Sequence, residues 1–198
     1  MAARLVPNAG SITIRQLLNH TSGLAEYESD RRYLKPYLSG DFSYFWAPRK
    51  LVRLAVSHKP LFAPGMTAHS SYSNTNYILL GLIAERVTHK PLAAAFEHRI
   101  FQPLHLRDTS YPTKPGLPSP YAHGYLVLGQ PPARDVSGLS PSLAGAAGAI
   151  VATATDVATF YRALLSGRLL KPNLLNAMKT TISEGSNKLI DKAYCSHE

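Results

Sequence analysis

An apolar stripe at helical spacing constrains the fold of this chain more than any other feature of its sequence. The stripe lies between about Asn74 and Val87 and follows a Pro-Gly turn at Pro64-Gly65. Apolar residues that recur three and four positions apart predict a helix with one wide buried side. The stripe consists of Ile78, Leu79, Leu82, Ile83 and Val87.

Capping signals and prolines predict two helices before this one. Thr13 followed by Gln16 forms a capping box, and it favours a short helix that ends near Asn19-His20, with Gly23 supplying a positive-φ exit. Pro48 suits the first turn of a second helix, which Pro60 ends. The inward side of this second helix is predicted to carry Leu51, Leu54 and Ala55.

Three further helices are predicted downstream. One begins at Pro91 and ends before Pro103, with Leu92, Ala95, Phe96 and Ile100 inward. A second capping box, Thr153 with Asp156, starts another helix that Gly167 closes. The last helix is predicted over Pro172–Met178. Residues expected on the inner side of the helix after Thr153 are Val157, Phe160, Tyr161, Leu164 and Leu165.

Strand signals are sparse by comparison. Residues 25–47 are rich in aromatic side chains and favour a partly helical, partly irregular wall, and residues 111–120 hold four prolines and cannot be regular. A strand is predicted over Tyr121–Leu128, followed by a turn at 129–132, with a second strand near Arg134–Val136 left open. The chain is therefore expected to be mainly α.

Composition excludes several classes of function. The 198 residues suit one domain or one large lobe, and the net charge of +9 comes from scattered Lys and Arg, without the runs typical of nucleic-acid binding. A single cysteine, Cys195, cannot form a disulfide within the chain. No metal or cofactor motif is present. No apolar leader or membrane-length run occurs either, so the chain as it stands is expected to be unexported, with no membrane span.

The string Tyr72-Ser73-Asn74 places a phenol and an amide at the start of the 74–87 helix. This string and four segments of the chain, which occur in the same order, resemble the serine β-lactamase-like superfamily. The segments are Thr13–Leu24, Phe62–Glu85, Pro103–Thr109 and Gly145–Gly167. Class C β-lactamases, D-alanyl-D-alanine carboxypeptidases and related esterases belong to this superfamily. The resemblance implies that Tyr72 transfers protons and that Asn74 orients substrate and a lysine. The alternative is a simple helix entry, with Ser73 or Asn74 as cap and Tyr72 packed as an aromatic wall.

The sequence departs from that superfamily where the nucleophile should be. None of its nine lysines has Ser or Thr three positions earlier, and neither Lys-Thr-Gly nor His-x-Gly occurs. Ser71 and Ser73 flank Tyr72, but without a lysine partner neither is a convincing nucleophile. The resemblance covers most of residues 5–180 and only the middle of the superfamily's domain. It implies the helical lobe of an α+β fold, with a few short strands and the central sheet largely missing, over residues 1–182, and an irregular tail over 183–198.

Three functions remain open at this stage. The first is a part of a β-lactamase-related serine hydrolase that acts on a peptide, lactam or ester but is inactive alone. The second is a non-catalytic module that binds a peptidoglycan-like ligand or pairs with a partner subunit. The third is an inert truncated reading frame. The superfamily is often periplasmic or secreted, and uncovered apolar surface would favour self-association. His20–Gly23 are expected to be a helix stop and loop, and Gly145–Ala149 a site of close packing.

Overall fold

The computed structural model describes residues 6–67, 69–127 and 132–180. Helices dominate this part of the chain, and its strands are two short segments, β1 (Tyr125–Leu126) and β2 (Arg134–Asp135), paired antiparallel. The irregular tail predicted over 183–198 lies outside the described residues. The mainly helical character expected from the sequence is therefore confirmed.

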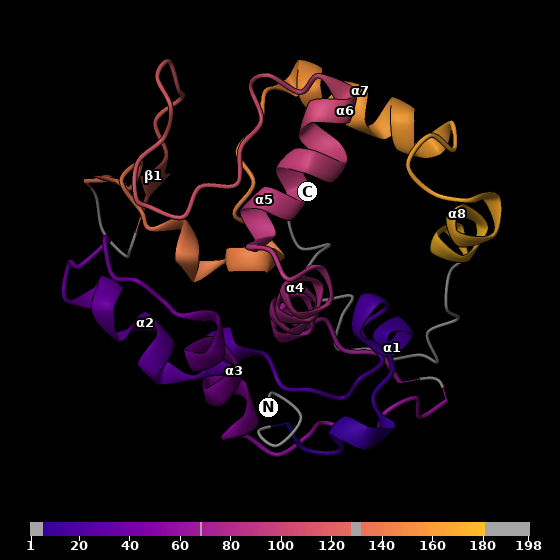
Figure 1. The fold of residues 1–198 in the computed structure, drawn as a ribbon. Coiled ribbons are helices and arrows are strands. Elements are labelled where there is room, and N and C mark those ends of the chain that lie inside the picture. The colour runs from indigo at the N-terminus through magenta and orange to yellow at the C-terminus, as the bar shows by residue number, and fades with distance from the viewer. Residues whose placement is uncertain (1–5, 68, 128–131, 181–198) are drawn as a thin grey trace, which may run out of the picture.

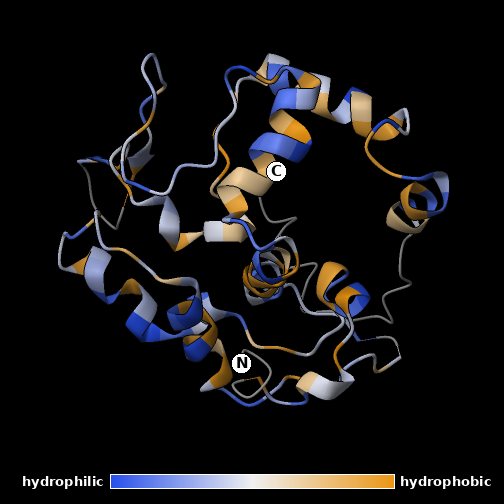
Figure 2. Cartoon of the chain, in the orientation of Figure 1, coloured by the Kyte–Doolittle hydropathy of each residue, from blue (hydrophilic) through white to orange (hydrophobic). Residues whose placement is uncertain are grey.

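Helix α4 (Asn74–Thr88) lies at the centre of the molecule, as Figure 1 shows. Around it pack α1 (Ile14–Leu18), α3 (Pro48–Val56), α5 (Leu92–Phe96) and the short 3-10 helix η6 (Gly145–Ala147). The buried positions Ile78 and Leu79 lie on the predicted apolar stripe, and Figure 2 shows hydrophobic residues along α4 among more polar ones. The far end of the stripe is uncovered, since Val87 is 73% exposed.

The main core lies on the side of α4 that faces α3 and the aromatic segment before it. Tyr27 and Leu51 are fully buried there, and Tyr33 stacks on Trp46 with their ring centroids 5.7 Å apart. The segment contains the 3-10 helix η3 (Tyr27–Ser29) and α2 (Arg31–Leu38), as expected from its mixed composition. Leu51, Leu54 and Ala55 of α3 are all buried, which confirms the predicted inner face.

The helix that begins after Pro91 is longer than predicted. It runs through α5, a π-helical turn (Glu97–Phe101) and α6 (Gln102–Leu104), so the expected end before Pro103 is wrong. Proline normally disrupts a helix because it lacks an N–H. Here Pro103 lies in the first turn of α6, directly after the π turn changes the hydrogen-bond register.

Helix α7 (Ala154–Leu165) starts as predicted but with only half of the expected capping box. The Thr153 hydroxyl accepts the Asp156 N–H, whereas the Asp156 carboxylate accepts bonds from the Asp108 N–H and the Thr109 hydroxyl. Asp156 therefore ties α7 to the loop after α6. Of the five side chains predicted to face inward, Val157, Tyr161 and Leu165 are exposed. The last helix, α8 (Pro172–Lys179), agrees with prediction.

Two glycines permit close contacts, Gly23 in the loop after α1 and Gly81 on α4. Gly23 has φ +73°, and a Cβ there would collide with the Phe62 carbonyl oxygen, so this position serves packing and not only a helix exit. The helix exit itself is His20, the first left-handed residue after α1, with φ +60°. A Cβ on Gly81 would lie 2.5 Å from Ala146 Cβ, which shows how tightly η6 packs on α4. The packing role expected for Gly145–Ala149 fits this contact.

Candidate active site

Tyr72 and Asn74 lie together at the N-terminal end of α4. The Tyr72 hydroxyl donates a hydrogen bond to Asn74 Oδ1 at 2.8 Å. The Tyr72 side chain is 55% exposed, and Asn74 is partly buried. This geometry differs from a simple helix entry, in which the Tyr72 ring would be packed inside. It leaves a phenol and an amide side by side on an open surface.

The helix end beneath this pair is anchored by a carboxylate. Glu26 Oε2 accepts the Asn74 N–H at 2.5 Å, and its other oxygen accepts the Glu28 N–H. Burial raises the pKa of Glu26 above its ordinary value, against the opposing effect of these backbone hydrogen bonds. A negative group at a helix N-terminus offsets the helix dipole. The positive helix end is therefore already occupied by Glu26 and does little to favour a Tyr72 phenolate.

Hydroxyl groups fix the first turn of α4 to the segment before η3. Ser73 Oγ and Thr75 Oγ1 both donate to the Ala25 carbonyl, at 3.1 and 2.8 Å, and both residues are fully buried. Ser73 is therefore an anchor, and its hydroxyl is not available as a nucleophile. Ser73 does not cap the helix with its side chain, because its hydroxyl makes no capping hydrogen bond to α4.

His20 lies beside the pair, in the segment predicted to be only a stop and a loop. Its ring centroid is 4.6 Å from that of Tyr72 and 5.4 Å from that of Tyr77. His20 Nδ1 faces the Ser73 N–H and the Asn76 amide nitrogen, each at 3.2 Å. Burial lowers the pKa of His20 below its ordinary value, although the Ser73 hydrogen bond opposes this.

Sequence reasoning missed His20, Glu26 and Asn76 as parts of this site. One signal was available for Asn76, because it lies three residues before Leu79 on the buried side of an otherwise apolar helix. A buried amide needs hydrogen-bond partners, and Ser22 and His20 supply them. No comparable pattern marks Glu26, which reaches α4 from a distant part of the chain.

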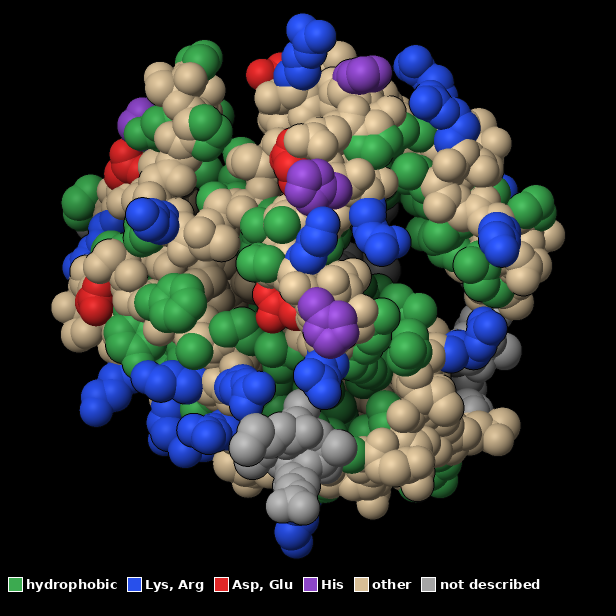
Figure 3. All heavy atoms as spheres, viewed as in Figure 1, with side chains coloured by type: hydrophobic (Ala, Val, Ile, Leu, Met, Phe, Trp, Pro, Cys, Tyr) green, Lys and Arg blue, Asp and Glu red, His purple; other side chains and the backbone are tan. Residues whose placement is uncertain are grey.

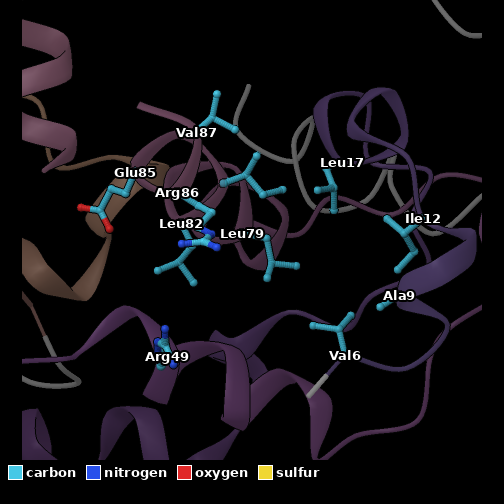
Figure 4. A pocket seen from close by; sticks show the side chains of 11 residues that line it. Val6, Ala9, Ile12, Leu17, Arg49, Leu79, Leu82, Glu85, Arg86 and Val87 are labelled. Carbon is cyan, nitrogen blue, oxygen red and sulfur yellow. The ribbon is translucent and has the colours of Figure 1, made fainter. Parts of the chain in front are cut away.

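The 3-10 helix η6 packs farther along α4 than the Tyr72–Asn74 pair. Gly145 lies against Ile78, and Ala146 against Gly81, one and two turns beyond Asn74. A separate hollow of about 760 Å³ is lined by α4, by α1 and by the segment before α1 (Figure 4). Leu17 of α1, Leu82 of α4 and Val6 point into it, with Arg49 and Glu85 at its edge. Tyr72 does not line this hollow.

No group of three His, Cys, Asp or Glu side chains able to hold a metal ion occurs in residues 6–67, 69–127 and 132–180. No helix within those ranges is long and apolar enough to cross a membrane. Lys and Arg side chains gather over α2 and α3 on the face seen in Figure 3. These helices carry Arg31, Arg32, Lys35, Arg49, Lys50 and Arg53.

Residues 3–190 match the family model described as Beta-lactamase. The chain belongs to the β-lactamase family. A D-stereospecific amidohydrolase from Streptomyces sp. is 42% identical, with a TM-score of 0.84, over 92% of this chain and 56% of its own. D-amino acid amidase from Ochrobactrum anthropi SV3, complexed with D-phenylalanine, is 31% identical, with a TM-score of 0.73, over 86% and 49%. Penicillin-binding protein 4* of Bacillus subtilis (strain 168) is 30% identical over 58% of this chain and 25% of its own length.

These matches confirm the family and the mainly α part of its fold. The chain spans about half the length of the solved relatives and about a quarter of the length of the curated relative. Membership of a serine hydrolase family makes the Tyr72–Asn74 pair the candidate active-site wall. Their catalytic role stays a prediction.

Proposed function

We propose that this chain is the helical part of a serine amide hydrolase, in which Tyr72 and Asn74 form one wall of the active site. The observation that carries the proposal is the 2.8 Å hydrogen bond between the two side chains on an open surface at the start of α4. A structural helix entry does not require an exposed phenol in contact with an amide. An acyl-transfer site does require a proton-transfer group beside a substrate-orienting group.

In the proposed reaction, a serine oxygen attacks the amide carbonyl carbon while the Tyr72 phenolate takes the serine proton. Tyr72 then gives that proton to the leaving nitrogen as the carbon–nitrogen bond breaks. Water hydrolyses the resulting ester and regenerates the serine. The Asn74 amide nitrogen carries two N–H donors that can orient a substrate carbonyl. A neighbouring lysine ammonium is needed to favour the phenolate, because Glu26 already occupies the helix end.

Residues 1–198 hold no Ser-x-x-Lys. The proposal therefore assigns the nucleophile and its lysine to protein outside these residues, in a longer polypeptide or in a partner subunit. A non-catalytic module that binds a cell-wall peptide is the alternative, and it would use the same surface without turnover.

The substrate we propose is an amide next to a D-amino acid residue. Two relatives carry that chemistry in their names, the D-stereospecific amidohydrolase and the D-amino acid amidase. Both cover most of this chain, which supports the same substrate class here.

The test is a chimera in which residues 6–180 replace the corresponding region of the Streptomyces amidohydrolase. We expect hydrolysis of D-phenylalanine amide, and we expect Tyr72→Phe and Asn74→Ala to lower kcat by roughly 10²- to 10⁴-fold. Tyr161→Phe is the matched control, since Tyr161 is 54% exposed on α7, away from the site. A folded chimera that binds D-phenylalanine without turnover would favour the binding module. Full activity in Tyr72→Phe would overturn the proposed role of Tyr72.

A further inference from the structure

His20 contacts the chain on both sides of Tyr72. Its carbonyl oxygen accepts the Ser71 N–H at 3.0 Å, and its Nδ1 accepts the Ser73 N–H at 3.2 Å. Its ring lies 4.6 Å from the Tyr72 ring, centroid to centroid. One residue thus holds the backbone before and after Tyr72 and also contacts its side chain.

The hydrogen bonds determine which ring nitrogen of His20 carries the proton. A backbone N–H can only donate, so Nδ1 must accept from Ser73. The Ser22 hydroxyl donates to Asn76 Oδ1 at 2.6 Å, which leaves the Asn76 amide nitrogen facing His20 Nδ1 at 3.2 Å. Two donors therefore point at Nδ1, and the ring is neutral with its proton on Nε2.

The backbone of His20 is also in an uncommon conformation. Its φ of +60° lies in the left-handed region, which residues other than glycine seldom adopt. Asn76, which faces the ring, and Ser22, which donates to Asn76, are 0% and 2% exposed. A buried polar network that fixes a left-handed residue beside an exposed phenol has more structure than a helix stop requires.

We propose that His20 is a positioning residue that holds Tyr72 against Asn74 only while its Nδ1 is an acceptor, so that acid releases Tyr72. Only the effect of His20 on catalysis rests on the proposed function; the positioning of Tyr72 does not. An imidazolium would turn an N–H toward the Ser73 N–H and the Asn76 amide hydrogens. Three donors would then face one another, and the contact would open.

Within residues 6–67, 69–127 and 132–180, few other titrating groups face this ring. The phenols of Tyr72 and Tyr77 flank it, and Tyr77 donates to the Leu18 carbonyl. The Glu26 carboxylate accepts the adjoining Asn74 N–H, and burial raises the pKa of Glu26 above its ordinary value. His20 forms no ion pair with any residue in the described part of the chain. Glu26→Gln, which keeps an acceptor oxygen, separates the acid response of Glu26 from that of His20.

The test follows Tyr72 by NMR of the chain labelled with ¹³C-tyrosine, with Tyr72→Phe assigning the signal. We expect the Tyr72 ring signal to shift as pH falls below 6.5 in the native chain and in Glu26→Gln. His20→Asn keeps an acceptor oxygen two bonds from Cβ and tolerates positive φ. It should retain the neutral-pH position of Tyr72 and lose the acid shift. His20→Phe keeps an aromatic ring without the acceptor and should displace Tyr72 at every pH.

His89→Asn is the control for backbone conformation, because His89 has φ +53° on exposed surface at the end of α4. It should leave the Tyr72 signal and its acid shift unchanged. In the chimera, His20→Phe should lower kcat for D-phenylalanine amide about 10- to 100-fold, and His20→Asn should restore it at neutral pH.

An acid shift of Tyr72 that persists in His20→Asn would overturn the proposal, and so would a Tyr72 signal unchanged in His20→Phe. The NMR experiment needs no turnover. An inactive chimera would therefore count against the proposed hydrolase while leaving the NMR result to decide the role of His20.

Discussion

At the scale of single residues, Asp30 links two helices through a partly ionic cluster. Its buried carboxylate accepts the Arg32 N–H at the start of α2, pairs with the Arg32 guanidinium, and contacts His58 Nε2 at 3.0 Å beyond α3. Hydrogen bonds from the Arg32 side chain hold the pKa of Asp30 well below its ordinary value near 3.8. A depressed carboxylate pKa adds stability that is present above 3.8 and is lost as pH falls through that value toward the folded pKa.

We therefore expect Asp30→Ala to lower the free energy of unfolding by about 1–3 kcal/mol at pH 6, through loss of the cap and of the charge-assisted bonds. Asp30→Asn keeps a capping oxygen and should lose less. Urea unfolding from pH 6 to pH 3 measures both effects, and the stability difference between the native chain and Asp30→Asn should narrow as the pH falls below 3.8. The exposed pair Asp135–His123 is the matched control, and Asp135→Asn should change stability little. An Asp30→Ala loss that does not shrink toward pH 3 would contradict the ionic part of this account.

The serine chemistry of the chain is a second prediction at this scale. No serine has a lysine three residues on, and Ser73, beside Tyr72, donates to the Ala25 carbonyl. We expect the 198-residue chain to show no stoichiometric labelling by a fluorophosphonate or a fluorescent penicillin. Mass spectrometry of the intact protein and its peptides measures this, with an active serine hydrolase as the positive control. One mole of label on any single serine would sink this prediction.

At the scale of elements, Gly81 sets the distance between α4 and η6. A Cβ at this position would lie 2.5 Å from Ala146 Cβ and 3.2 Å from Leu92 Cδ2. Alanine in place of glycine gains up to about 1 kcal/mol of helix propensity, whereas overpacking costs typically about 1–3 kcal/mol. The backbone near Ala146 cannot yield as a flexible side chain would, so the clash should win.

Gly81→Ala is therefore expected to destabilise the chain by up to about 2 kcal/mol, the clash less the gained propensity. Adding Ala146→Gly removes the colliding methyl group and should recover most of the loss. Gly138→Ala, with open space around its Cβ, should be close to neutral. Urea unfolding of the single and double variants gives the coupling between residues 81 and 146. Additive effects of the two substitutions would show that this contact does not set the helix spacing.

Local signals made most of the helices predictable. The capping box at Thr13 and Gln16 is present with both of its bonds, and Pro48 begins α3 as expected. The helix predictions were wrong where contacts with distant segments, or a change of hydrogen-bond register, determine the local structure. The Asp156 carboxylate accepts a hydrogen bond from the Asp108 N–H in place of a bond at its own helix end. The helix continues past Pro103 because a π turn precedes this proline. No local pattern in the sequence reports either outcome.

The candidate site shows the same division. The string Tyr72-Ser73-Asn74 correctly pointed to a phenol and an amide at one helix end. The groups that hold them, His20 and Glu26, lie about fifty residues earlier in the chain and meet α4 only through the fold. A sequence can point to a candidate site when its groups are close in the chain, and it misses supporting residues that come from distant segments.

At the scale of the whole molecule, several helices turn apolar side chains to the surface. Val157, Tyr161 and Leu165 lie four residues apart on α7 and are 42%, 54% and 56% exposed. Positions four apart share one face of a helix, so these side chains form a continuous apolar strip. Other exposed large hydrophobic residues lie on α1 and α8, namely Ile14, Leu18, Leu174 and Met178.

An apolar strip of this length in water favours association, because pairing two such strips removes apolar area from solvent at about 25 cal/mol per Å². We expect the 198-residue chain to sediment as a mixture of monomer and larger species at micromolar concentration. Leu165→Glu should shift the distribution toward monomer, because a buried, unpaired carboxylate opposes pairing of the strip. Leu38→Glu is the matched control, since Leu38 is 70% exposed on α2, outside the strip, and should leave association unchanged. Equal effects of the two substitutions would assign association to net charge, and a native chain that stays monomeric would show that the α7 strip does not drive it.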